Sequence, residues 1–233
     1  MQTPTLSVPD DPTALVEQLS GALTAVADLD QAPAMAAYLK DRFVLFGVKT
    51  PIRRKIAKPY VDAFRGAPEH VVPFAHACYA RDERELHYVA VDTLRRWQRH
   101  LGPQHLEDLR VLLTTHSWWD TVDSLAAHPV GHLVKRHPEL VATMDAWIDD
   151  ENLWLARTAI LHQLTYKADT DEERLFRYVL ARADSTEFFL RKAQGWALRT
   201  YARVNADAVR RFVAEHEDRL SGLTRREATK HLR

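Results

Sequence analysis

The stretch Ser117-Trp118-Trp119-Asp120-Thr121-Val122-Asp123 places two tryptophans and two carboxylates at the start of a predicted helix. Ser117 has the side chain of an N-cap, and Asp120, three residues later, completes the pattern of a capping box. Residues four apart share a helix face, so we expect the Trp119 indole beside the Asp123 carboxylate. The stretch therefore predicts a capped helix that presents an anion next to an aromatic plate. The residues expected on a second, core-facing side are Trp118, Val122 and Leu125.

Asp123 lies one turn inside this predicted helix, where the helix dipole favours the ionised carboxylate. The alternative is that Trp119 only packs and Asp123 is only solvated, as most tryptophans and exposed acids are. These seven residues leave both interpretations open.

Helix-start signals recur about every 15–20 residues along the chain. Seven glycines in 233 residues are few, and no long run of alternating β-branched residues appears, so the sequence predicts an all-α fold. Antiparallel helix pairs of about 35–45 residues have the period of HEAT-like repeats. We expect these pairs to stack into a curved right-handed solenoid with a concave face. Residues 1–9 are expected to form a disordered tail, and residues 10–233 a single domain.

Local signals predict individual helix boundaries. Asp11-Pro12 and Asn205 are typical helix starts. A helix is expected from Pro33 through Phe46, with Gly47 as its stop. Two further capping boxes are predicted, at Asp82 with Glu85 and at Thr224 with Glu227.

Cysteine use and hydropathy indicate the compartment. Cys78 is the only cysteine, which excludes a disulfide framework within the chain and indicates a reducing, cytoplasmic environment. No apolar run approaches the roughly 20 residues that a membrane span needs, and no N-terminal targeting segment is evident. We therefore expect a cytoplasmic protein without a membrane partner.

The formal net charge of zero conceals two basic zones. Residues 40–65 carry eight Lys or Arg and two acids, and residues 191–233 carry eleven and five, so each zone has a net charge of +6. Two such zones on an otherwise acidic chain indicate a surface that binds a polyanion, although solvated helix faces would give the same charges. The candidate contacts to such a polyanion in these zones are Lys49, Arg53, Arg54, Lys192, Arg199 and Arg203.

Arg157 is the single charge in the apolar segment Leu153–Leu161. A carboxylate such as Asp123 and a phosphate are both suitable partners for its planar guanidinium. A buried structural ion pair is the alternative to a role in binding.

Trp196, Arg199 and Arg203 share one face of a predicted helix in the second basic zone. Aromatic and basic side chains in alternation suit phosphate contact and base stacking. Phe188 and Phe189 on the same helix are better explained by core packing.

Other chemistries lack their residues. His128 and His132 have metal-ligand spacing, but Pro129 lies between them and no third ligand is evident, so we expect no metal. The chain has no glycine-rich phosphate loop, no GxSxG and no HExxH. Neither Lys167 nor Lys192 shows a feature that marks a desolvated nucleophile.

Five blocks of sequence, in order, are similar to the AlkD-type alkylpurine DNA glycosylases, a family of HEAT-like-repeat DNA repair proteins. The similarity extends from about Met35 to the C-terminus. The blocks are Met35-Ala36-Ala37-Tyr38-Leu39-Lys40, Phe46-Gly47-Val48-Lys49-Thr50-Pro51, the Ser117–Asp123 stretch, Trp154-Leu155-Ala156-Arg157, and Glu187-Phe188-Phe189-Leu190-Arg191-Lys192-Ala193-Gln194-Gly195-Trp196.

The resemblance implies a catalytic cleft lined by Asp123, Trp119 and Trp196, with Arg157 and Tyr38 as DNA contacts. It also implies excision of cationic purines alkylated at ring position 3 or 7 from duplex DNA, without flipping of the base, unlike most base-acting enzymes. The DNA would bind in the concave face, and the polyanion contacts predicted in the two basic zones would be DNA contacts. A monomer, no metal and no cofactor are expected, with the protein on the nucleoid when it is bound to DNA.

The residues suit such a reaction. An alkylpurine cation is a good leaving group, so a carboxylate that stabilises oxocarbenium character on the sugar is the main requirement. Without a lysine nucleophile the product would be an abasic site. Two other classes stay open: a non-catalytic helical-repeat scaffold for DNA or protein, and a nuclease. The nuclease is disfavoured because Asp120 and Asp123 lie on different faces and would not share a Mg²⁺ ion.

Overall fold

The computed structural model describes residues 11–232, which divide into two compact units, the first ending at Leu101 and the second beginning at Gly102. The regular secondary structure of the described residues is helical, and their only extended pairing is an isolated bridge between Val44 and Glu83. The expected all-α fold is confirmed. The tail predicted at residues 1–9 lies outside the described residues. None of the described helices is long and apolar enough to cross a membrane.

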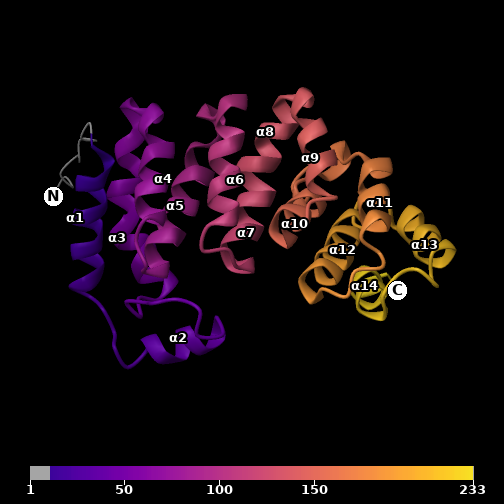
Figure 1. Cartoon of the computed structure of the whole chain (residues 1–233), viewed down its shortest axis with the longest axis horizontal. Coiled ribbons are helices and arrows are strands. Elements are labelled where there is room, and N and C mark those ends of the chain that lie inside the picture. Colours follow the sequence, from indigo (N-terminus) through magenta and orange to yellow (C-terminus); the bar gives the residue numbers. More distant parts are fainter. Residues whose placement is uncertain (1–10, 233) are drawn as a thin grey trace. The chain divides into compact units, whose positions relative to one another are not determined.

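The first unit contains five α-helices (Figure 1). They are α1 (Pro12–Thr24), α2 (Ala32–Tyr38), α3 (Thr50–Asp62), α4 (Val71–Tyr79) and α5 (Arg84–Trp97). Helix α4 packs against α1 and α5, and α3 packs against the same two helices. The core is formed by the apolar faces of α1, α4 and α5, in which side chains such as Leu19, Phe74 and Leu94 are fully buried.

The second unit contains nine α-helices (Figure 1). They are α6 (Leu106–Thr114), α7 (Trp119–Leu125), α8 (Gly131–Arg136), α9 (Val141–Trp147), α10 (Leu153–Leu161), α11 (Glu172–Ala181), α12 (Phe188–Tyr201), α13 (Ala206–Glu215) and α14 (Gly222–Thr229). Helix α10 is the centre of this unit, because it packs against α6, α7, α9, α11 and α12. Its apolar sequence follows from this position, since a helix covered on all sides has no face for water.

Two helix starts agree with their local signals. The Asp11 carboxylate caps α1 by accepting a hydrogen bond from the Thr13 N–H at 2.8 Å, with Pro12 at the first helical position. The Asn205 side chain caps α13 by accepting one from the Ala208 N–H at 3.1 Å. At both positions the side chain satisfies a backbone donor that the helix itself leaves free.

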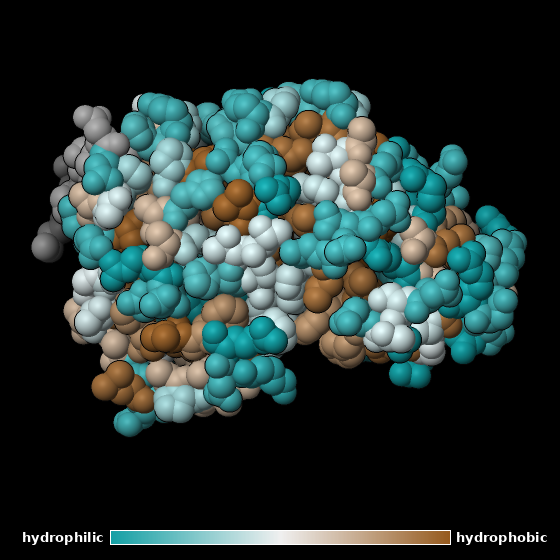
Figure 2. All heavy atoms as spheres, in the orientation of Figure 1, coloured by the Kyte–Doolittle hydropathy of each residue, from teal (hydrophilic) through white to brown (hydrophobic). Residues whose placement is uncertain are grey.

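The helix expected from Pro33 through Phe46 is wrong beyond Tyr38. Lys40 and Asp41 take left-handed backbone conformations, with φ of 63° and 55°, which end α2. The chain then runs extended to the bridge at Val44. None of the residues of α2 is buried, and Figure 2 shows apolar side chains at the surface around this helix.

Both capping boxes predicted outside the Ser117 stretch are wrong, because each glutamate has a tertiary partner instead. The Glu85 carboxylate is buried and accepts hydrogen bonds from the N–H groups of Phe46, Gly47 and Val48 at 3.0–3.1 Å. Burial raises its pKa against the effect of these bonds. Glu227 pairs with two cations of α12, and the cap of α14 is the Ser221 hydroxyl, which accepts from the Thr224 N–H at 3.0 Å.

Gly195 allows α12 and α14 to approach closely. A Cβ atom at Gly195 would overlap the Glu227 Cβ and would lie 2.8 Å from the Thr224 carbonyl oxygen. The glycine thus allows α14 to pack directly against α12.

The predicted single domain and repeat solenoid stay predictions. Two compact units with their own cores can still unfold as one cooperative body, so the boundary after Leu101 does not decide the domain count.

Candidate active site

Helix α7 begins one residue later than its capping-box pattern predicts. Its N-cap is Trp118, which has an extended backbone with φ −157° and ψ 158°. The Ser117 hydroxyl instead donates to the Leu113 carbonyl at 2.7 Å, and the Asp120 carboxylate accepts from the Thr121 N–H at 3.1 Å. The predicted capping box at Ser117 and Asp120 is therefore wrong, although the helix itself is present.

Trp118 anchors this helix start in the core, as expected. Its ring meets Trp154 of α10 and Phe189 of α12 edge-on, with centroid distances of 5.8 and 4.9 Å. Val122 and Leu125 are fully buried beneath it, in agreement with their expected core positions. The Phe188 ring meets the Phe189 ring at a centroid distance of 5.4 Å, but Phe188 is 58% exposed, so the core position predicted for it is wrong.

Asp123 and Arg157 form a bidentate ion pair between α7 and α10. The guanidinium donates from Nε to Oδ1 at 2.7 Å and from Nη2 to Oδ2 at 2.8 Å. Arg157 Nη1 donates to the Phe189 carbonyl of α12, so three helices meet at this one side chain. The guanidinium is buried and already engaged, and the phosphate contact expected of Arg157 stays a prediction.

The Asp123 carboxyl lies at the edge of the core with a side chain that is 16% exposed. Burial raises its pKa above the ordinary aspartate value, and the hydrogen bonds and charge of Arg157 oppose that rise. The bidentate pair requires an ionised carboxylate. Asp123 is thus an anion in a weakly hydrated position whose orientation is fixed by Arg157.

Asp123 lines an open cleft of about 480 Å³. Trp119 from α7 and Trp196 from α12 line the same cleft, so the three predicted catalytic residues are together on one surface. Arg203, predicted as a DNA contact, also lines it. We call this surface the aromatic–acidic cleft; its other lining residues are Asp120, Ser124, Ala127, His128, Leu164, Thr165 and Thr200.

A π-helical turn at Ala126–Val130 continues α7 and carries Ala127 and His128 into the cleft. Pro129 lies within this turn, and a widened turn accommodates a proline that would break a regular helix. The turn therefore extends the cleft wall beyond the end of α7.

Two predicted DNA contacts on α12 face α14 rather than the cleft. Glu227 accepts from Lys192 at 2.7 Å and also pairs with Arg199. These contacts lower the pKa of Glu227, with the Lys192 hydrogen bond as the largest cause. The expected common face of Trp196, Arg199 and Arg203 is thus divided, with Arg199 turned toward α14 and the other two on the cleft.

The candidate DNA contacts of the first unit differ in accessibility. Arg53 is buried, pairs with Asp92 at 3.2 Å and stacks over the Tyr88 ring, and its expected phosphate contact stays a prediction. Arg54 shares the same carboxylate but is largely exposed. Lys49 and Tyr38 are exposed and stay predicted DNA contacts.

The sequence matches the family of DNA alkylation repair enzymes over residues 19–232. The chain belongs to this family. A predicted DNA alkylation repair enzyme from Enterococcus faecalis has a similar structure, with a TM-score of 0.82 and 29% identity over 88% of this chain and 96% of that one. AlkD2 from Streptococcus mutans shares the fold, with a TM-score of 0.59 and 17% identity over 79% and 90% of the chains. No curated protein matches.

Membership of the DNA alkylation repair family implies DNA as the substrate and makes the aromatic–acidic cleft its candidate active site. Within residues 11–232, no three His, Cys, Asp or Glu side chains gather as a metal site would require. His128, considered in the sequence only as a metal ligand, lies on the cleft instead.

Several residues that line the aromatic–acidic cleft were not predicted from the sequence. Ser124 and Ala127 follow Asp120 and Asp123 at helical spacing, so the face of α7 could have indicated them. Thr165 and Thr200 come from other elements and have no local signal. They join the cleft only because α10 packs against α12.

Proposed function

We propose that the protein is a monofunctional DNA glycosylase that hydrolyses the N-glycosidic bond of cationic 3- or 7-alkylpurines in double-stranded DNA. The observation that carries this proposal is the Asp123 carboxylate, held by Arg157 and exposed in the same cleft as Trp119 and Trp196. The two indole faces and the fixed carboxylate together favour binding of a positively charged group in the cleft.

In the proposed reaction, the bond between C1′ of the deoxyribose and the ring nitrogen breaks, and its electron pair passes to the purine. The ring loses its positive charge on departure, so the base needs no proton from a general acid. Positive charge develops on C1′ and the ring oxygen of the sugar, and Asp123 stabilises it electrostatically. Water then adds to C1′ and loses a proton, which leaves an abasic site.

Trp119 and Trp196 would hold the cationic nucleotide before the bond breaks. Each indole face attracts a cation by about 0.5–2 kcal/mol, depending on how far water is excluded. Because the excised base becomes neutral, this attraction weakens after the reaction and helps the product to leave.

Arg157 is the positioning residue in this proposal. It binds both oxygens of the carboxylate, does not itself line the cleft, and so orients Asp123. No lysine lines the aromatic–acidic cleft among the described residues, which supports hydrolysis over a Schiff-base step that would cut the strand.

The proposed protein acts as a monomer in the cytoplasm, on the nucleoid when bound to DNA, and without metal or cofactor. Its reaction would open base excision repair of alkylated DNA. The alternative function, a non-catalytic scaffold that binds DNA or protein, would need neither the Asp123–Arg157 pair nor the aromatic pair at the cleft.

Release of 7-methylguanine from alkylated duplex DNA tests the proposal directly. We expect metal-free release by the wild type and loss of most of it in Asp123→Asn, with DNA binding retained. Asp120→Asn is the matched control, because Asp120 lines the same cleft without the Arg157 pair. Binding without release by the wild type would favour the scaffold function.

A further inference from the structure

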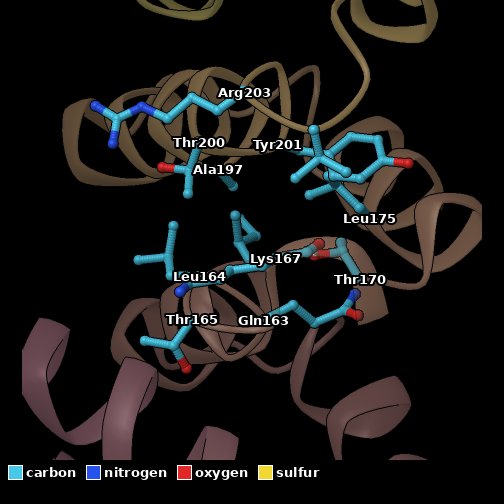
Figure 3. A pocket seen from close by; sticks show the side chains of 12 residues that line it. Gln163, Leu164, Thr165, Lys167, Thr170, Leu175, Ala197, Thr200, Tyr201 and Arg203 are labelled. Carbon is cyan, nitrogen blue, oxygen red and sulfur yellow. Dashed lines mark hydrogen bonds between the residues drawn. The ribbon is translucent and has the colours of Figure 1, made fainter.

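A second pocket, of about 460 Å³, adjoins the aromatic–acidic cleft within the same unit (Figure 3). We call it the side pocket. Its walls are formed by the end of α10 with the segment after it, by α11, and by the C-terminal part of α12. The residues that line both hollows are Leu164, Thr165, Thr200 and Arg203. The proposed reaction leaves the side pocket without a role.

The side pocket has the opposite chemistry to the cleft. Most of its wall is apolar, and no carboxylate lines it among the described residues, whereas the cleft contains Asp120 and Asp123. A cationic purine is therefore disfavoured here, and an uncharged flat group is favoured. The apolar lining residues are Ile160, Leu164, Leu175, Ala197, Tyr201 and Val204.

Most polar groups of the side pocket already have partners in the protein. The Gln163 amide exchanges two hydrogen bonds with the backbone of Asp171, at 2.8 and 3.2 Å. The hydroxyls of Thr165 and Thr170 donate to the carbonyls of Ala127 and Lys167. Few groups are left to read the edge of a base, so recognition here depends on shape and apolar contact and tolerates any sequence.

Two cations stand at the side pocket, on opposite walls. Figure 3 shows the Lys167 and Arg203 side chains reaching toward the same end of the pocket. Both residues are exposed, and within residues 11–232 neither side chain makes an ion pair or hydrogen bond. Lys167 has φ 56°, an uncommon conformation for a residue other than glycine. Two exposed cations without an acid attract an anion such as a phosphate.

We propose that the side pocket is a subsite for one unstacked nucleotide of the DNA that has an uncharged base, next to the nucleotide in the aromatic–acidic cleft. The neutral base enters the apolar pocket, and its phosphate lies between Lys167 and Arg203. The cleft selects a cation and the side pocket a neutral base with an anionic phosphate, so the two hollows take different nucleotides. This proposal depends on one part of the proposed function, namely that the protein acts on DNA.

Equilibrium binding to short unmodified duplexes tests the subsite apart from any base release. The probes are a fully paired duplex, a duplex with one unpaired nucleotide, and a duplex whose unpaired nucleotide is abasic. We expect the wild type to bind the base-bearing bulge about tenfold more tightly than the abasic bulge, within the range for stacking one base on protein.

Val204 lines the side pocket and is about half exposed, so Val204→Trp should fill part of the pocket and remove the preference for the base-bearing bulge. Lys167→Gln and Arg203→Gln should instead weaken binding to both bulges alike. Each should lower the slope of log affinity against log salt concentration by about one.

The control variants change the same residue types elsewhere in the second unit. Val111→Trp places an indole at an exposed position of α6, and Arg211→Gln removes an exposed cation of α13; neither residue lines the two hollows. Both controls should keep the wild-type preference and salt slope.

Equal wild-type affinity for the two bulges would overturn the subsite. So would an unchanged preference in a Val204→Trp variant that melts like the wild type. Base release is measured on alkylated DNA, so its failure would count against the glycosylase proposal and would leave the bulge comparison unaffected.

Discussion

Arg157 holds both carboxylate oxygens of Asp123, with N–O distances of 2.7 and 2.8 Å, and joins α7 to α10. The third guanidinium bond, to the Phe189 carbonyl, connects the same side chain to α12. A planar guanidinium that makes two parallel bonds fixes the plane of the carboxylate as well as its position. The pair therefore determines which edge of Asp123 faces the cleft.

Substitution of Arg157 should mainly reduce stability, and substitution of Asp123 should mainly reduce activity. Arg157→Ala leaves a partly buried carboxylate without its cation, so we expect the free energy of unfolding to fall by about 3–5 kcal/mol. Asp123→Asn should lower base release on the order of 10²-fold or more, the scale reported for the loss of one electrostatic group in an active site. Denaturant unfolding and single-turnover release measure the two quantities. Retained activity in Asp123→Asn would contradict the role of this carboxylate.

The rate of base release should fall as the solution is acidified, and this fall should begin at a higher pH than it would with an aspartate of ordinary pKa. Burial raises the pKa of Asp123, and only its ionised form stabilises positive charge on the sugar. Release is expected to increase as pH rises through this pKa. It should then stay level, because a cationic base requires no general acid. Single-turnover rates across pH on 7-methylguanine DNA test this shape, and an acid limb at the ordinary aspartate pKa, near 3.9, would contradict it.

Replacement of the cleft tryptophans should affect cationic bases in particular. Trp119→Leu and Trp196→Leu keep apolar bulk but remove the indole face, so each should slow release of a cationic alkylpurine roughly 2- to 30-fold. Trp118→Leu is the contrast, because Trp118 packs in the core and its loss should reduce stability first. Equal effects of all three substitutions on release and on thermal unfolding would argue against a cation–π role.

The ion pairs of Glu227 should contribute to stability rather than to DNA affinity. Lys192→Gln or Arg199→Gln is expected to lower the free energy of unfolding by roughly 1–2 kcal/mol. Arg203→Gln should leave it unchanged, since its side chain is exposed and makes no ion pair within residues 11–232. Because its partners lower the pKa of Glu227, this stabilisation is present above the unfolded-state pKa and is lost as pH falls through the folded one. Chemical denaturation at two pH values provides the measurement.

Helix ends were predictable from sequence where residues next to them in the chain determine the cap. They were not predictable where the capping side chain binds a partner that is distant in sequence. Asp11 and Asn205 cap helices through hydrogen bonds to residues two or three positions away, and the sequence contains all of that information. Glu85 has the same local pattern with Asp82, yet its carboxylate binds three N–H groups about 38 residues away in sequence. A capping box and a tertiary anchor have the same sequence signature.

The cleft shows the same division. Helical spacing alone places Trp119 and Asp123 on one face, and the structure has both on the cleft. The sequence did not decide whether Arg157 binds a carboxylate or a phosphate. Only the packing of α7 against α10 brings Asp123 within reach of Arg157. Thr165 and Thr200 had no signal, since their neighbours in sequence do not determine which helices meet.

Gly195 should tolerate no side chain, although alanine is the better helix former. Gly195→Ala would drive its Cβ into Glu227 and toward the Thr224 carbonyl, so we expect the free energy of unfolding to fall by about 1–3 kcal/mol. Gly21 in α1 is the matched control: no atom lies within 4 Å of a Cβ there, and Gly21→Ala should raise stability by about 0.5–1 kcal/mol. Thermal and denaturant unfolding of both variants give the two signs. A Gly195→Ala protein as stable as the wild type would mean that α14 can move away from α12 without cost.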